Sequence, residues 1–382
     1  MSADRGAKRP KILHIHSSFA PGGKELRSVQ LMNAFGAKAG HVIVSGDLEQ
    51  MGAAKQIAGR VPTLYPQDFP RLDGAPTPGK LAKLARAMQG HDLVLTYNWG
   101  AIDAVMAHTL FKDAMGLPPL IHHEDGFNED ERDKLKTKRN WYRRIALGKA
   151  SGLMVPSETL EEIALTAWQQ PMGRVKRIAN GIDTGAFAKK PKPGALRGVI
   201  KQKDERWVGT LAGLRPVKNL PRLVRAFAVL PEQWQLVIVG EGPEREAIQA
   251  EAERLGMSHR LHMPGFAPDP ARFVGLFDIF ALSSDSEQFP ISVVEAMAAG
   301  CPVVAPDVGD VMQIVSEPNR RYIGPGKVED ALAASLDTLA RDADERAAIG
   351  AANRELAREA YDQRRMIDAY RRLYASAMGR EL

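Results

Sequence analysis

The feature that most constrains the fold of this chain is an alternation of short apolar runs with amphipathic stretches. Helical patterns in the first half lie at Glu25–Lys38, Lys80–Gln89, Ala101–Phe111 and Glu158–Trp168. Such an alternation is typical of a parallel sheet whose strands are joined by crossover helices. The strands expected in this half are Ile12–His16, Val42–Ser45, Leu93–Tyr97, Leu120–His123, Leu153–Pro156 and Val175–Ile178.

The alternation breaks and then starts again. Asn180-Gly181 is a turn signal, and Lys189–Gly198, rich in Pro, Lys and Gly, predicts an interdomain linker. The second series has strands at Trp207–Leu211, Leu236–Gly240, Leu261–Met263, Ile279–Leu282 and Val303–Ala305, and helices at Pro221–Leu230, Pro243–Leu255, Ile291–Ala299 and Glu329–Arg341. We therefore expect an α/β fold of two Rossmann-like domains, residues 1–188 and 189–360, facing across a cleft. A C-terminal helix, residues 361–382, is expected to return to the first domain.

Composition narrows the class of protein. The single cysteine, Cys301, lies in an apolar run, which predicts a buried thiol and excludes a disulfide framework. No signal peptide or membrane span is expected, because no apolar run is long enough, and we expect a cytoplasmic protein. The net charge is +6, and residues 1–185 hold the surplus, with 25 Lys and Arg against 19 Asp and Glu. A basic first half favours an anionic partner.

The segment most informative about chemistry is Ser283–Ala305, which reads SSDSEQFPISVVEAMAAGCPVVA. Pro290 fits the first turn of a helix, which leaves the N–H groups of Ile291 and Ser292 free to bind an anion or a sugar hydroxyl. Glu287 precedes this helix and Glu295 lies about one turn inside it. The two carboxylates can hold different parts of one polyol, although two solvated acidic residues remain an alternative.

Further candidates follow other predicted strands. Arg215 and Lys218 lie between a strand and a helix, where two cations suit a diphosphate; two solvated surface charges are the alternative. Gly22-Gly23 follows the first strand, where glycines let backbone N–H groups approach a phosphate. His122 and His123 end a strand, where a histidine could hydrogen-bond a sugar; a structural role is the alternative. A metal cluster at His122–Asp125 is disfavoured, because adjacent strand residues point to opposite faces.

The string around Glu287 resembles the E-x7-E segment of retaining GT-B glycosyltransferases, especially glycosyltransferase family 4. Residues 295–298, Gly300 and residues 302–304 are in register with the family pattern, whereas Gln288 and Pro290 stand where glycines are usual. Residues 209–220 are similar to the family's G-x-L-x-x-x-K-N segment. Residues 180–183 with Phe187 are similar to its N-G-[VI]-D-x3-F segment.

This resemblance implies a retaining transfer of a hexose-type sugar from a nucleotide diphosphate sugar to a glycan or lipid-linked acceptor, in surface polysaccharide or glycolipid synthesis. It implies no cofactor and no metal. A nucleic-acid-binding module is disfavoured by the residues themselves, because the basic surplus is small and no basic-aromatic binding motif appears. Arg215 and Lys218 would stabilise the leaving diphosphate, and Glu295 would hold the ribose. Glu287 and His123 would contact the sugar, with His122 as the fallback for His123. The implied donor site also contains Gly22, Gly23, Gly265, Phe266, Phe289, Pro290, Ile291 and Ser292, and the acceptor candidates are Asn98, Glu124 and Asp125.

Three alternatives stay open at this point. A GT-B-like sugar-nucleotide epimerase would use a similar site without an acceptor. A nicotinamide-dependent dehydrogenase would explain two Rossmann-like domains, but Gly240–Arg245 does not complete the glycine fingerprint. Residues 132–149, with eight basic residues, form either a helix that meets an anionic membrane surface or an ordinary solvated face.

Overall fold

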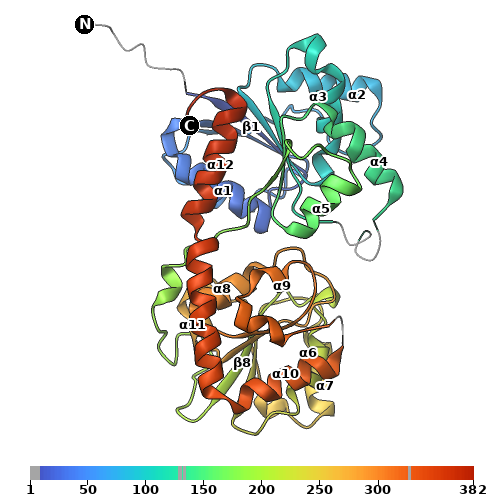
Figure 1. The fold of residues 1–382 in the computed structure, drawn as a ribbon. Coiled ribbons are helices and arrows are strands. Elements are labelled where there is room, and N and C mark those ends of the chain that lie inside the picture. Colours follow the sequence, from blue (N-terminus) through green and yellow to red (C-terminus); the bar gives the residue numbers. More distant parts are fainter. Residues whose placement is uncertain (1–8, 128–130, 132–134, 326–327) are drawn as a thin grey trace, which may run out of the picture. The chain divides into compact units, whose positions relative to one another are not determined.

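The computed structural model describes residues 9–127, 131, 135–325 and 328–382. The chain forms two compact units, of which unit 1 comprises residues 1–179 and 366–382 and unit 2 comprises residues 180–365. The backbone therefore passes from one unit to the other twice (Figure 1). Each unit has its own parallel sheet and its own hydrophobic cores.

Unit 1 contains a seven-stranded parallel sheet in the order β3-β2-β1-β4-β5-β6-β7. Its central strands carry almost only buried residues, as is usual for a parallel sheet covered on both faces. The strands are β1 (Lys11–His16), β2 (Gly40–Ser45), β3 (Thr63–Leu64), β4 (Leu93–Tyr97), β5 (Leu120–His123), β6 (Gly152–Val155) and β7 (Val175–Arg177).

Two layers of helices cover this sheet (Figure 1). The helices on one face are α2 (Pro78–Met88), α3 (Ile102–Met115), α4 (Thr137–Ala146) and α5 (Glu158–Thr166). The opposite face carries α1 (Gly23–Phe35) and α12 (Gln363–Met378). Ser157 caps α5 as its position in the sequence predicts, because its hydroxyl accepts a hydrogen bond from the N–H of Leu160.

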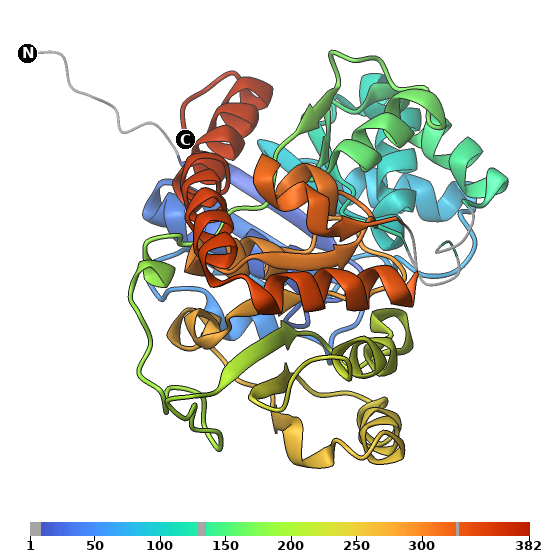
Figure 2. The ribbon, with the colours of Figure 1, turned by 60° about the horizontal axis from the view of Figure 1, so that its bottom comes forward.

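Unit 2 contains a six-stranded parallel sheet in the order β10-β9-β8-β11-β12-β13 (Figure 2). Its strands are β8 (Arg206–Leu211), β9 (Trp234–Val239), β10 (Leu261–Gly265), β11 (Ile279–Ala281), β12 (Val303–Pro306) and β13 (Ile323–Gly324). On one face pack α6 (Leu220–Phe227), α7 (Arg245–Arg254) and α10 (Glu329–Arg341). On the other pack α8 (Ile291–Ala299), α9 (Val311–Ile314) and α11 (Ala343–Ala360).

The chain passes from unit 1 to unit 2 between residues 179 and 180, earlier than the linker predicted at residues 189–198. Residues 180–188 belong to unit 2, and Phe187 packs in its core. The Pro-rich stretch 189–198 also lies within unit 2, where Leu196 is buried in the same core. Leu196 anchors this irregular segment by burying its apolar side chain, a contact that the Pro, Lys and Gly content does not reveal.

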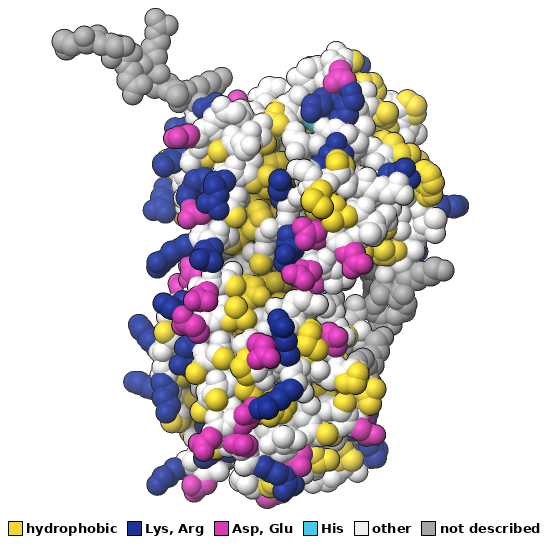
Figure 3. Space-filling model, in the orientation of Figure 1, with side chains coloured by type: hydrophobic (Ala, Val, Ile, Leu, Met, Phe, Trp, Pro, Cys, Tyr) yellow, Lys and Arg dark blue, Asp and Glu magenta, His cyan; other side chains and the backbone are white. Residues whose placement is uncertain are grey.

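The C-terminal helix α12 belongs to unit 1 from Met366 onward. Met366, Tyr370 and Tyr374 are buried against strands of unit 1, in agreement with the helix that we expect to return there. Its outer surface is polar, and Lys and Arg side chains gather over it (Figure 3). Cys301 is buried in unit 2, as predicted.

Candidate active site

The candidate donor residues of unit 2 share one edge of its sheet. Lys218 follows β8, Gly265 ends β10, and Glu287 follows β11. Because all strands of this sheet are parallel, the loops after them lie at the same edge, where α/β proteins bind their ligands. The unit-2 candidates predicted from separate motifs are thus brought together by the fold.

The central contact of this edge joins Lys218 and Glu287. Lys218 Nζ donates to Glu287 Oε1 at 2.5 Å, and the hydroxyl of Ser284 donates to the same oxygen at 2.6 Å. The side chains of Lys218 and Glu287 are 17% and 10% exposed, so the pair is only partly screened by water. The sequence predicts both residues at the donor site but not this direct contact between them.

Further hydrogen bonds fix the loop after β11 to the loop after β8. The N–H of Asp285 donates to the carbonyl oxygen of Val217 at 2.8 Å, and the hydroxyl of Ser283 donates to the carbonyl oxygen of Lys218 at 2.9 Å. Arg222 on α6 is buried and pairs with Asp285 at 3.0 Å. The positions of Lys218 and Glu287 are therefore set by backbone contacts as well as by their own ion pair.

Helix α8 begins at this edge with two available N–H groups. Pro290 is its N-cap, and in the part of the chain that the structure describes the N–H groups of Ile291 and Ser292 make no hydrogen bond. The N-terminus of a helix of this length attracts anions and hydroxyl oxygens. Phe289 lies just before the helix and packs against Tyr361 with ring centroids 5.8 Å apart.

Glu295 lies one turn inside α8 and has a strongly perturbed acidity. Burial raises the pKa of its carboxyl group to about 7, and no cation pairs with it among the described residues. A carboxylate that is buried without a partner gains stability when a ligand supplies hydroxyl donors. This environment suits the ribose-holding role that the family resemblance implies.

Arg215 and Phe266 extend outward from the same edge. Arg215 is exposed and forms no ion pair with any residue that the structure describes. Phe266 is 75% exposed directly after Gly265, where a solvated aromatic ring is unusual enough to indicate a ligand surface. Both residues lie where the sequence places them, at the ends of β8 and β10.

The glycine loop of unit 1 is electrostatically less favourable for phosphate than the start of α8 in unit 2. Gly22 is the N-cap of α1 and Gly23 begins the helix. The buried carboxylate of Glu25 lies against this loop, since a Cβ atom on Gly22 would be 2.7 Å from Glu25 Oε2. Lys24 pairs with Glu25. The helix terminus thus already faces one carboxylate of the chain itself, an arrangement that the glycine pair alone does not predict.

His123 is not available to a ligand in this structure. The side chain is fully buried, Nδ1 is hydrogen-bonded to the carbonyl oxygen of Thr96 at 3.1 Å, and Nε2 is hydrogen-bonded to the hydroxyl of Tyr374 at 2.8 Å. Burial, followed by the charge of Arg27, lowers the pKa of His123 to about 3. The expected sugar contact gains no support from this geometry, because α12 covers the ring. The fallback His122 is also buried and bonds Thr96 Oγ1 at 2.8 Å.

The acceptor candidates are engaged within unit 1. Glu124 is buried and accepts from Arg143 Nε at 3.1 Å. Asp125 forms a two-bond ion pair with Arg27. Burial raises the pKa of Asp125, but the charge of Arg27 and its hydrogen bonds, together with nearby positive charge, hold that pKa below its ordinary value. Asn98 supports this loop, since its Oδ1 accepts from the N–H of Asp125 at 2.8 Å. These contacts indicate that the three residues shape the loop after β5.

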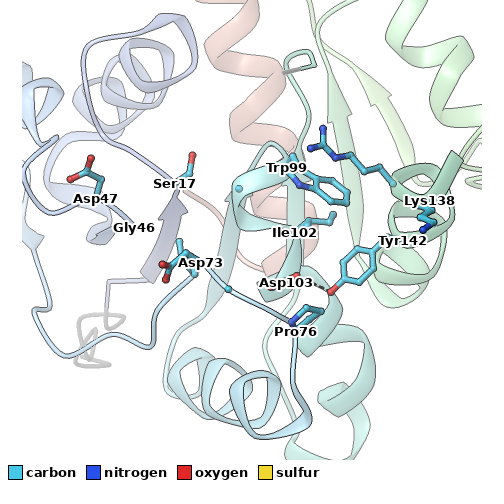
Figure 4. A pocket seen from close by; sticks show the side chains of 14 residues that line it. Ser17, Gly46, Asp47, Asp73, Pro76, Trp99, Ile102, Asp103, Lys138 and Tyr142 are labelled. Atoms are coloured by element: carbon cyan, nitrogen blue, oxygen red, sulfur yellow. Dashed lines mark hydrogen bonds between the residues drawn. The ribbon is translucent and has the colours of Figure 1, made fainter. Parts of the chain in front are cut away.

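A cavity in unit 1 lies beside these residues and was not foreseen from the sequence. It has a volume of about 570 Å³ and opens at the carboxyl ends of β1, β2 and β4 (Figure 4). Its lining residues come from many separate segments, so no sequence motif could mark it. They are Ser17, Gly46, Asp47, Leu72, Asp73, Gly74, Pro76, Trp99, Gly100, Ile102, Asp103, Lys138, Arg139 and Tyr142.

The basic segment 132–149 is only partly a surface feature, and its residues 132–134 lie outside the described residues. Arg143 is buried in α4, where its guanidinium lies 4.8 Å from the ring centroid of Trp99 and 5.1 Å from that of Trp168. Its expected contact with a membrane surface is therefore wrong, because the side chain points into unit 1. Trp141 and Ile145 are exposed on the same helix.

None of the helices within the described residues has both the length and the apolar character that a membrane span requires.

Known proteins resemble the chain in fold and, in part, in sequence. A solved structure of Anabaena HepE in complex with UDP matches with a TM-score of 0.79 and 21% identity, covering 96% of this chain and 100% of that one. The match confirms the predicted GT-B fold.

Two curated relatives are similar over part of their length. A glycosyltransferase of Methanocaldococcus jannaschii is 30% identical over 195 residues, 49% of this chain and 50% of that protein. A GDP-mannose-dependent alpha-(1-6)-phosphatidylinositol monomannoside mannosyltransferase of Mycobacterium tuberculosis is 30% identical over 249 residues, 61% of this chain and 62% of that protein. This chain thus spans half to three-fifths of the length of these relatives.

The similarity to a known family lies in the second half of the chain. Residues 196–356 match the family model described as glycosyl transferases group 1. This range contains Lys218, Glu287 and Glu295, the residues that converge at one edge of unit 2. In residues 196–356 the chain is therefore similar to the group 1 glycosyl transferases.

Proposed function

We propose that this chain is a retaining glycosyltransferase that moves a hexose-type sugar from a nucleotide diphosphate sugar to a glycan or lipid-linked acceptor. The observation that carries the proposal is the contact of Lys218 with Glu287 beside the start of α8. That arrangement supports the proposal, because a cation suits phosphate, a carboxylate suits sugar hydroxyls, and both lie close to two N–H groups at the start of a helix. The relatives support the donor class, since one is named as GDP-mannose-dependent and one structure contains UDP.

The proposed roles follow from charge. As the glycosidic bond breaks, negative charge grows on the leaving diphosphate. Lys218 stabilises it where little water competes, and the exposed Arg215 adds a second positive charge. Glu287 accepts hydrogen bonds from the hydroxyls of the transferred sugar and orients it for attack. Glu295 holds the ribose, and Phe266 offers an apolar surface to the base.

A thermal-shift screen with a panel of nucleotide sugars tests the donor site. At about 100 times Kd, the matching nucleotide should raise the melting temperature by roughly 5 °C. The shift should grow between pH 6 and pH 8, because the pKa of Glu295 is about 7 and its charged form accepts hydroxyl hydrogens more strongly.

Glu295→Gln should lose both the shift and its pH dependence, whereas Glu253→Gln, at an exposed position of α7, should retain them. Equal shifts in the two variants would contradict the ribose role. Incubation with the donor alone separates transfer from epimerisation, since an epimerase converts the donor without any acceptor.

We also propose that α4 brings the protein to the cytoplasmic face of a membrane, where a lipid-linked acceptor would lie. Trp141 and Ile145 are 57% and 53% exposed one helical turn apart, and Lys138 and Arg144 are exposed beside them. An exposed aromatic and aliphatic pair flanked by basic side chains suits an interfacial helix. The relative that acts on a phosphatidylinositol monomannoside supports this acceptor class.

The double substitution Trp141→Ser and Ile145→Ser should lower partitioning onto vesicles containing phosphatidylglycerol by at least about 10-fold. The reason is that the variant lacks the two apolar side chains whose transfer from water into the membrane interface favours binding. Vesicle sedimentation measures the effect. Met172→Ser, at an exposed position outside α4, is the control and should change nothing. Unchanged partitioning of the double variant would remove the membrane from the proposal.

A further inference from the structure

Unit 2 contains a cavity of its own, away from the candidate donor residues. The cavity has a volume of about 370 Å³ and lies between the 3₁₀ helix Glu317–Tyr322, which directly precedes β13, and the first two turns of α11. The donor residues follow their strands, whereas this 3₁₀ helix comes before its strand. Because the sheet is parallel, the cavity lies at the opposite edge from the candidate donor site. A ligand held in the cavity therefore does not occupy the donor site.

A buried hydrogen-bond network fixes the two walls of this cavity to each other. Asn319 Nδ2 donates to the carbonyl oxygen of Val303 at 2.7 Å, and Asn319 Oδ1 accepts from the N–H of Val303 at 2.8 Å. Asn353, on α11, donates to Asn319 Oδ1 at 2.7 Å and accepts from the hydroxyl of Ser316 at 2.6 Å. The network thus joins the 3₁₀ helix to α11 before any ligand arrives, which lowers the ordering cost of binding.

Both walls contribute apolar lining. Pro318 comes from the 3₁₀ helix, and Ala348 and Ile349 come from α11. Ile349 is fully buried. Next to it, a Cβ atom on Gly350 would lie 2.1 Å from the carbonyl oxygen of Gly300, so α11 is held directly against the end of α8. The apolar lining therefore belongs to a rigid surface, on which a hydrocarbon group of a ligand leaves water.

The charged residues of the cavity are one ion pair and two further side chains of opposite sign. Arg321 pairs with Glu345 of α11. Glu317 and Arg320 form no ion pair with any residue that the structure describes. They are three residues apart on a 3₁₀ helix, where such residues lie on the same side. The cavity thus offers a free carboxylate and a free guanidinium next to each other, beside an apolar surface.

We propose that this cavity binds a free amino acid with an aliphatic side chain. The carboxylate of the ligand accepts from Arg320, and its ammonium group donates to Glu317. Its side chain packs against Pro318, Ala348 and Ile349. A simple anion fits less well, because it would meet the carboxylate of Glu317 and leave the apolar lining uncovered. This inference goes beyond the proposed transferase function and does not depend on it.

Isothermal titration calorimetry tests the ligand class, with leucine, isoleucine and valine as the amino acid probes. The comparison probes are 4-methylpentanoate, which is leucine without its ammonium group, 3-methylbutylamine, which is leucine without its carboxylate, and inorganic phosphate. At least one amino acid should bind the wild type. Each comparison probe should bind at least about 10-fold more weakly than that amino acid, because each lacks one of the two charged contacts.

Substitutions at the cavity locate the site. Ala348→Trp, which places an indole in the cavity, should abolish binding of the amino acid. Arg320→Ala and Glu317→Gln should each weaken binding about 10-fold, because each removes one charged partner. Amide hydrogen exchange should slow on binding in residues 316–322 and 343–352, which form the two walls.

Matched controls lie outside the cavity. Ala347→Trp adds an indole at the neighbouring exposed position of α11, which does not line the cavity. Arg364→Ala and Glu253→Gln each change an exposed charged residue elsewhere. All three variants should bind the amino acid like the wild type.

The proposal is overturned if none of the three amino acids binds, if 4-methylpentanoate or phosphate binds at least as tightly as they do, or if Ala348→Trp binds as the wild type does. Its failure is distinct from that of the transferase proposal. Ala348→Trp should keep the thermal shift produced by the matching nucleotide, because the donor residues lie at the other edge of the sheet. If no nucleotide binds the wild type, the transferase proposal fails while the amino acid titration still decides the cavity.

Discussion

Alanine at Lys218 or at Glu287 is expected to slow sugar transfer by at least about 100-fold with the fold intact. Lys218 Nζ lies 2.5 Å from Glu287 Oε1, in a setting where both side chains are largely shielded from water. A charged group held in such a place stabilises a transition state far more than a solvated one does. Initial rates with the matching nucleotide sugar, and circular dichroism for the fold, measure the outcome.

The two substitutions should differ in what they change. Lys218→Ala removes a phosphate contact, so it should weaken nucleoside diphosphate binding as well as kcat. Glu287→Ala removes a sugar contact, so nucleoside diphosphate should bind as before while transfer falls. Because the residues touch, the double variant should be less impaired than the product of the two single effects.

Controls come from the same unit. Lys203→Ala and Glu253→Ala remove exposed charges away from this edge and should retain wild-type rates. Lys218→Arg keeps the charge and should recover part of the activity lost in Lys218→Ala. If both alanine variants transfer sugar at near the wild-type rate, the assignment of this edge as the donor site is wrong.

The sequence predicts regular elements wherever hydrophobic periodicity is long. Leu93–Tyr97 and Ile291–Ala299 are found with the predicted bounds. The two-residue edge strands Thr63–Leu64 and Ile323–Gly324 were missed, because two residues cannot show a period. Such strands form only because a neighbouring strand presents unpaired backbone groups.

The same distinction between local pattern and long-range contact applies to the candidate site. Lys218 and Glu287 follow adjacent strands, so a parallel sheet alone brings them to one edge. The burial of His123 depends on Tyr374, 251 residues later in the chain, and no local pattern reveals that contact. The cavity of unit 1 was missed for the same reason, since its lining residues, such as Asp47 and Lys138, come from separate segments that share no motif.

Unit 1 is expected to lose its tertiary structure in mild acid, between about pH 6 and pH 4, because its core contains buried neutral histidines. His14 and His41 are hydrogen-bonded to each other at 2.9 Å, and His16 stacks on Tyr97 with ring centroids 3.9 Å apart. Burial is the main reason that the pKa of each of these histidines is lowered, and for His14 and His16 neighbouring positive charge adds to it.

The sign of the effect follows from proton binding. In the unfolded chain a histidine has a pKa near 6.5 and binds a proton as the pH falls, whereas the folded core resists that proton. The stability is therefore complete above about pH 6.5 and declines toward the folded pKa, which for His41 is about 4. At pH 5 the lowered pKa of His41 alone reduces the free energy of unfolding by about 2 kcal/mol. Several such losses approach the total stability of a domain, roughly 5–15 kcal/mol.

His16→Phe tests this account most directly. Neither ring nitrogen of His16 has a hydrogen-bond partner among the described residues, so phenylalanine keeps the stacking on Tyr97 and removes only the proton site. The acid midpoint, followed by near-ultraviolet circular dichroism, should move to lower pH by several tenths of a unit. His259→Gln replaces an exposed histidine of unit 2 and should leave the midpoint unchanged. If the acid titration of His16→Phe coincides with that of the wild type, buried histidine protonation is not what limits the stability of unit 1.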